Sequence, residues 1–121
     1  MDKKALKREY KETARPMGVY QIRNTVNGKV LIGTSVDLPS ILNRRRGELR
    51  AGRHQNSALQ KDLKELGADA FEVETLDTLP PSEQPGYDPA DDLAALEGLW
   101  LEKLRPYGER GYHAEPKAGK S

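Results

Sequence analysis

The sequence predicts a mixed α/β fold of the α+β type, a small three-stranded antiparallel sheet flanked by helices. Two β-prone runs, 18–24 and 29–34, are joined through Asn27-Gly28, the dipeptide that most strongly indicates a hairpin. Three later segments have leucines at helical spacing, and a short alternating run precedes the last of them. The expected order is therefore α-β-β-α-α-β-α, which packs as one sheet with helices against it.

The first two helices are predicted from their ends. Residues 2–14 have helical propensity but a thin apolar stripe, so they indicate a marginal N-terminal helix that ends before Pro16. After the hairpin, Asp37 is a suitable N-cap and Pro39 suits a first helical turn. We expect this second helix to continue to about Arg50.

The next helix and the third strand follow directly. Asn56 or Ser57 can cap the helix, Ser57 and Gln60 match a capping box, and Gly67 suits its C-terminal end. Residues 71–75 alternate with period two, which predicts the third strand.

The rest of the chain gives the last helix and the domain limits. The proline-rich stretch 80–89 predicts an exposed loop, and a strong helix is expected over 90–104. We predict an N-terminal helical extension over 1–16, one domain over 17–113 and a flexible tail over 114–121.

Composition excludes several classes of protein. The 121 residues fit one domain, and the absence of cysteine excludes disulfides, thiolate metal sites and thiol nucleophiles. No apolar run could span a bilayer, so we expect a cytoplasmic protein with no membrane partner. Residues 1–61 carry 14 basic and 5 acidic groups, whereas residues 62–121 carry 6 and 14. This asymmetry suits a polyanionic partner, although solvated charge segregation explains it equally well.

One carboxylate lies on an apolar helix face. Glu97 falls within a helical stripe, where a carboxylate must be paired, protonated or bound to a metal. It is a site candidate, and the alternative is a stripe-edge residue that reaches water or an arginine. The stripe consists of Leu93, Leu96, Trp100, Leu101 and Leu104.

A basic cluster follows the hairpin, and its arginines can hold phosphate oxygens. Arg45 is directed to the same face as Leu42 and Leu49, although a charge run is usually a solvated face. His54 and His113 show no metal-ligand spacing. The candidate nucleic-acid-binding residues are Lys29, Arg44, Arg45, Arg46, Arg50, Arg53, His54 and Asn56.

These segments together resemble a known family. The resemblance is carried by six segments: GVY at 18–20, LIG at 31–33, the NRRR helix, GRHQNSALQKDLKELG, FEVETL and LEGLWLEKLRPYGERGYH. Their type and order are similar to those of the conserved segments of the GIY-YIG nuclease superfamily. That superfamily includes homing endonucleases and the N-terminal domain of the excinuclease C subunit. The resemblance covers about residues 17 to 113 and implies a GIY-YIG-like fold.

The resemblance also implies a mechanism. Active members hold one divalent metal, usually Mg²⁺, through a single glutamate that matches Glu97. The tyrosine of the first tag acts near the attacking water and matches Tyr20. The metal acts as a Lewis acid on the phosphate and an arginine stabilises developing charge.

Three positions depart from the family pattern. The second tag's tyrosine is Leu31, the family's helix arginine falls on Ile41, and the closing asparagine is His113. Leu31 and Ile41 can neither hydrogen-bond nor carry charge. Arg44, one turn beyond Ile41, is the first candidate to replace the missing arginine, and Arg45 is the second.

Three functions are open at this point. The chain is a nuclease-like module that binds nucleic acid, DNA in the first place, with weak or absent cleavage, or an active metal-dependent endonuclease in which Arg44 replaces the arginine. The third alternative is a regulatory domain that binds protein. The sequence predicts neither the structure of the substrate nor the oligomeric state.

Overall fold

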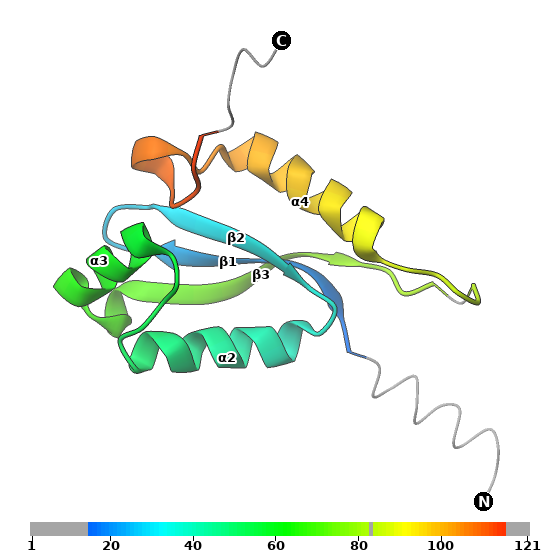
Figure 1. Cartoon of the computed structure of the whole chain (residues 1–121), viewed down its shortest axis with the longest axis horizontal. Helices are drawn as coiled ribbons and strands as arrows, with labels where there is room; N and C mark the ends of the chain where they lie inside the picture. The colour runs from blue at the N-terminus through cyan, green and yellow to red at the C-terminus, as the bar shows by residue number, and fades with distance from the viewer. Residues whose placement is uncertain (1–14, 83, 116–121) are drawn as a thin grey trace, which may run out of the picture.

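The computed structural model describes residues 15–82 and 84–115 (Figure 1). The helix expected over 2–14 lies outside the described residues. The elements are β1 (Met17–Asn24), β2 (Val30–Ser35), α2 (Leu38–Arg50), α3 (Ser57–Leu66), the short 3-10 helix η1 (Ala68–Ala70), β3 (Phe71–Leu79), α4 (Ala90–Leu104) and the short 3-10 helix η2 (Gly108–Arg110).

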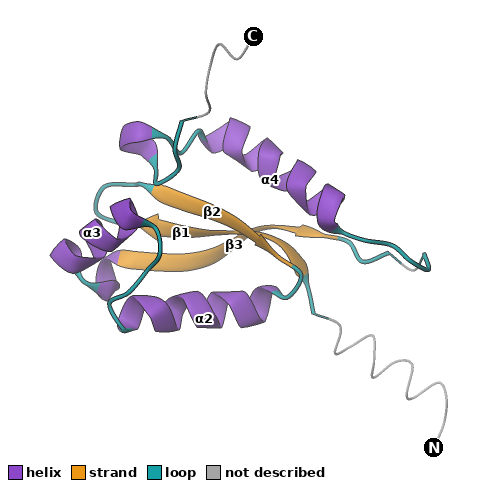
Figure 2. Cartoon of the chain, in the orientation of Figure 1, coloured by secondary structure: helices purple, strands orange, loops and turns teal. Residues whose placement is uncertain are grey.

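The three strands form one antiparallel sheet with the order β2-β1-β3. Helix α2 covers one face of this sheet and α4 covers the other, with α3 beside the hairpin end (Figure 2). The predicted α+β fold is therefore confirmed. Strand β1 is central, and β2 and β3 are the edge strands.

Side-chain alternation along β1 divides the core into two layers. Tyr20 and Ile22 belong to the cluster on the α2 face, whereas Val19 belongs to the cluster on the α4 face. A register shift in the pairing of β1 with β3 lies between Val19 and Tyr20. Alternate side chains of a strand point to the same side, which is why Tyr20 and Ile22 share a cluster.

The helix ends follow the predicted residues with one exception. The Asp37 side chain accepts a hydrogen bond from the amide of Ser40 and caps α2. Asn56 caps α3 by accepting from the amide of Leu59. The expected capping box of Ser57 and Gln60 is wrong, because the Gln60 amide group bonds the backbone of residues 52 and 54 instead.

The segment after α4 returns to the sheet and covers part of the β2 edge. The Tyr112 amide donates to the Val30 carbonyl at 3.0 Å, and the Tyr112 hydroxyl donates to Asp62 on α3 at 2.7 Å. Burial is the largest effect that raises the pKa of Tyr112, to about 12. Among the residues described, no helix is both long enough and apolar enough to cross a membrane.

Candidate active site

Tyr20 and Arg45 meet on the α2 face of the sheet. The Arg45 Nε–H donates to the Tyr20 hydroxyl oxygen at 3.1 Å, so the hydroxyl proton points elsewhere. Tyr20 is 6% exposed, and its ring lies across Gly33 of β2. A Cβ at Gly33 would meet the end of the ring at 2.6 Å. Glycine is therefore required there by close approach rather than by backbone conformation.

Glu48 holds the arginines of this site. Its two carboxylate oxygens accept from Arg45 Nη1 at 2.9 and 3.1 Å, and one of them lies 3.6 Å from Arg44 Nε. The Arg45 side chain is 20% exposed and that of Arg44 is 71% exposed. Burial lowers the pKa of Arg45, but the hydrogen bonds to Tyr20 and Glu48 outweigh it and raise the pKa overall. The inward arginine therefore remains charged.

His54 lies in the loop beside this cluster. Burial lowers its pKa, the Glu48 carboxylate partly opposes that shift, and Arg45 adds to it. Its Nδ1 accepts from the Asn56 amide at 3.0 Å. In the neutral side chain the proton is thus on Nε2, which can donate but cannot accept a proton.

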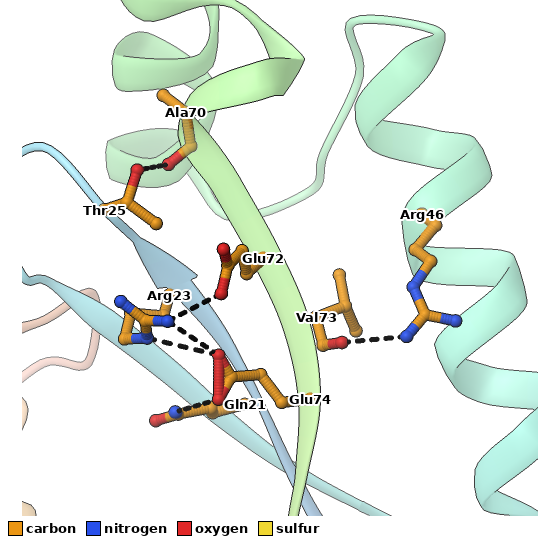
Figure 3. A network of polar contacts seen from close by, with 8 residues as sticks. All are labelled: Gln21, Arg23, Thr25, Arg46, Ala70, Glu72, Val73 and Glu74. Carbon is orange, nitrogen blue, oxygen red and sulfur yellow. Dashed lines mark hydrogen bonds and ion pairs between the residues drawn. The ribbon is translucent and has the colours of Figure 1, made fainter.

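The remaining arginines of α2 lie on the opposite flank of the helix. Arg46 and Arg50 line a groove of about 460 Å³ between α2 and β3, whose other wall carries Glu72 and Glu74. Figure 3 shows Arg46 reaching the Val73 carbonyl of β3, to which its Nη2 donates at 3.0 Å. The sequence grouped these arginines, but the fold divides them between two flanks.

Three other candidate binding residues lie near the hairpin and the α2–α3 loop. The Asn56 side chain is used twice within the protein, in the α3 cap and in a 2.9 Å bond to the Tyr112 carbonyl. The Lys29 ammonium lies 5.8 Å from the centre of the Tyr112 ring. Arg53 is exposed and lines a cleft together with Glu48 and His54.

The three residues that differ from the family pattern, Leu31, Ile41 and His113, make packing contacts or hydrogen bonds within the protein. Leu31 and Ile41 are half-buried and pack against the α2-face core. The Nε2 atom of His113 accepts from the Ile32 amide at 2.8 Å on the outer edge of β2. Burial lowers the pKa of His113, which favours this neutral acceptor form.

Glu97 lies on the other side of the sheet. Its helix, α4, packs on the Val19 layer, and Trp100 donates to Asp77 of β3 at 3.0 Å. Three residues of helix turn Glu97 about 60° around the axis from Trp100. Tyr20 belongs to the α2-face cluster and α4, which carries Glu97, packs on the opposite face, and no hydrogen bond joins the two residues among those described.

Glu97 offers a single carboxylate, which suits a cation whose remaining ligands are water and phosphate oxygens. The polar side-chain contacts of α4 within the described residues are made by Asp92, Trp100 and Glu102, which leaves the half-buried Glu97 carboxylate unshared there. Residues 15–82 and 84–115 contain no group of three or more histidine or acidic side chains that could hold a metal. Mg²⁺ commonly uses one or two carboxylates together with water and phosphate oxygens, so a single glutamate fits it.

Comparison with known proteins identifies the architecture. No family model matches the sequence. Two solved structures of the catalytic domain of the intron or homing endonuclease I-TevI, one of them a glutamate-to-alanine mutant, are each 28% identical to the chain. The TM-scores are 0.63 and 0.64, and the matches cover 81% and 83% of this chain and 92% and 99% of those chains. These matches confirm the resemblance to the GIY-YIG nuclease superfamily.

A curated relative agrees with this resemblance. Intron-associated endonuclease 1 of Enterobacteria phage T4 is 31% identical over 87 residues, which are 72% of this chain. The match spans about a third of that protein, 32% of its length. The GIY-YIG domain described here is therefore similar to one part of a larger endonuclease.

Sequence reasoning missed Glu48 as part of the site. The spacing could have indicated it, because Arg44 and Arg45 precede it by four and three residues on one helix. It had also ranked Arg44 before Arg45, but it is Arg45 that contacts Tyr20. The role of His113 had no comparable sequence pattern, since it depends on the return of the chain to the β2 edge.

Proposed function

We propose that this GIY-YIG-like domain binds DNA beside Tyr20 and Arg45, on the α2 side of the sheet, and cleaves its phosphodiester backbone weakly, in a metal-dependent reaction. The observation that carries the proposal is the 3.1 Å bond from Arg45 Nε to the Tyr20 hydroxyl. It supplies a guanidinium beside the tyrosine although Ile41 occupies the family's arginine position. In this proposal Arg45, rather than Arg44, replaces that arginine.

Each residue has a defined part in this function. Tyr20 keeps its hydroxyl proton available for a phosphate oxygen or a water molecule, since its oxygen already accepts from Arg45. The His54 Nε2–H donates to a phosphate, and Arg44 and Arg53 contribute exposed positive charge. Mg²⁺, when bound, supplies a Lewis acid for the phosphate, and Glu97 is the residue that would hold it.

Cleavage is expected to be weak because a polar group of the family pattern is missing. Leu31 packs in the core and cannot hydrogen-bond. Loss of one preorganised donor typically lowers a rate by about 10²–10³-fold. Arg45 restores a charge to the site, but Leu31 supplies no hydroxyl at the position of the second tyrosine.

Nicking of supercoiled plasmid in the presence of Mg²⁺ tests the cleavage. The wild-type chain should nick slowly, Glu97→Ala should abolish nicking, and Arg45→Ala should slow it by about 10²-fold or more. Arg46→Ala is the matched control, since it removes an equal charge from the same helix on the other flank. Equal losses in the Arg45 and Arg46 variants would contradict the assignment of Arg45.

Retention on DNA tests the binding separately. Affinity should fall as salt rises, because phosphate contacts release counterions. Arg44→Ala and Arg53→Ala should each flatten this dependence by about 0.9 in logarithmic slope. An affinity that does not change with salt would exclude the nucleic-acid interface and favour the protein-binding alternative.

A further inference from the structure

We infer that Glu48 is a positioning residue that aligns Arg45 on Tyr20 and does so at the expense of affinity for phosphate. The inference rests on the proposed function and deepens it by assigning a residue outside the family pattern. The hydrogen bonds and ion pairs of Glu48 among the described residues go to Arg44 and Arg45, not to Tyr20. It acts through the guanidinium that it holds.

Glu48 and Tyr20 together fix the orientation of the Arg45 guanidinium. Arg45 Nη1 donates to both Glu48 oxygens, while Nε of the same planar group donates to Tyr20. A guanidinium fixed at two of its nitrogens has a defined plane, and its remaining nitrogen, Nη2, then has a defined direction. Without Glu48, the single bond to Tyr20 would leave the group free to rotate.

Glu48 also lowers the positive charge of the site. The Glu48 carboxylate lies between Arg44 and Arg45, the position that a phosphate would take between two arginines. The three side chains together carry one net positive charge instead of two. A DNA phosphate is therefore attracted less strongly than two free arginines would attract it.

Glu48 is therefore expected to weaken the binding of DNA while it improves the alignment of Arg45. Glu48→Gln should bind DNA more tightly and with a salt dependence steeper by about 0.9 in logarithmic slope, equivalent to one further phosphate contact. In the same variant the Arg45 side chain should no longer be held in one orientation. A residue with a merely structural role would not improve binding while it loosened the site.

The experiment combines a spectroscopic readout with binding and cleavage. Exchange of the Arg45 Nε–H with solvent, followed by NMR, reports its bond to Tyr20 directly, and Tyr20→Phe identifies the signal. Exchange should be slow in the wild type and fast in Glu48→Gln. Binding to a short labelled DNA duplex gives the affinity and the salt slope. Plasmid nicking at saturating DNA should slow by up to about 10²-fold, the usual effect of misplacing a catalytic group.

Two variants separate charge from position. Glu48→Asp keeps the charge but shortens the side chain, so the wild-type salt slope should remain while Arg45 exchange becomes faster. Glu65→Gln, at an exposed position of α3, removes the same charge away from the site and should change none of the readouts.

The outcomes distinguish this inference from the proposed function. Unchanged exchange of Arg45 in Glu48→Gln, or nicking that rises together with affinity, would overturn the positioning role. A wild-type chain that binds DNA but never nicks it would refute the proposed cleavage alone. The exchange and binding measurements would then still decide the role of Glu48.

Discussion

Gly33→Ala should disrupt the site with a very small change in the protein. The added methyl group would lie 2.6 Å from Cζ and Oη of Tyr20, closer than any ordinary carbon contact. The ring must therefore move, and the 3.1 Å bond from Arg45 cannot persist when it does. Because Gly33 has no unusual backbone conformation, the effect comes from this collision alone.

The expected loss of stability follows from overpacking a buried contact. Inserting one methyl group into a packed region usually lowers the free energy of unfolding by about 1–3 kcal/mol. For a domain of this size, each kcal/mol lowers Tm by about 4–8 °C. Gly47→Ala is the matched control, because a Cβ there meets nothing within 4 Å and alanine suits a helix interior. That variant should gain about 0.5–1 kcal/mol.

Urea unfolding followed by the fluorescence of Trp100, the only tryptophan, measures these changes. A double-mutant cycle with Tyr20→Leu identifies the cause, since leucine lacks the part of the ring that lies across Gly33. In that background Gly33→Ala should lose most of its effect. An equal loss of stability with tyrosine and with leucine at position 20 would refute the close-approach explanation.

Three further predictions concern the rest of the fold. Tyr112→Phe should lower the free energy of unfolding by about 1–3 kcal/mol, since buried partners of its hydroxyl lose their bonds, and urea unfolding checks this. Burial lowers the pKa of His54 and of His113, so the stability linked to their neutral forms is complete above about 6.5 and is lost as pH falls from there through the lowered values. Tm measured across this range should fall with pH. Arg105→Gly should raise the free energy of unfolding by up to about 1 kcal/mol, because Arg105 has a φ of 45° at the end of α4.

Each of these predictions has a control. Asp62→Asn retains an acceptor for the Tyr112 hydroxyl and should be milder than Tyr112→Phe. His113→Asn should flatten the decline of Tm below pH 6.5, and an unchanged decline would exclude this histidine as its source. Arg110→Gly lies at an ordinary backbone conformation and should lower stability, so a gain in both glycine variants would contradict the left-handed explanation.

Local sequence patterns predicted the helices and strands well. They failed where pairing with a distant segment of the chain determines how far an element extends. Helix α4 was predicted over 90–104, the residues that it occupies, because a proline-rich loop and a leucine stripe define it locally. Strand β3 was predicted to Thr75 but continues to Leu79, since Met17 to Val19 of β1 pair with its second half. That pairing is non-local, and no pattern within residues 76–79 indicates it.

The site was predicted in part for the same reason. Strand alternation predicts that Tyr20 and Ile22 share one face, and helical periodicity directs Arg45 inward; the structure confirms both and shows that the face of Tyr20 is the one that α2 covers. The choice between Arg44 and Arg45 required knowing which helix flank faces Tyr20. Arg46 had no predicted partner, because its contact with Val73 crosses from α2 to a strand 27 residues later.

The contact of Arg46 with Val73 also bears on the pairing of the β3 edge with another chain. An exposed strand such as β3 offers carbonyls that the amides of another chain could use, and such edges are common starting points for aggregation. The guanidinium of Arg46 already occupies one of these acceptors and places a charge in the path of an incoming strand. The helix that carries Arg45 therefore also protects the β3 edge from pairing with another copy of the chain, through the side chain of Arg46.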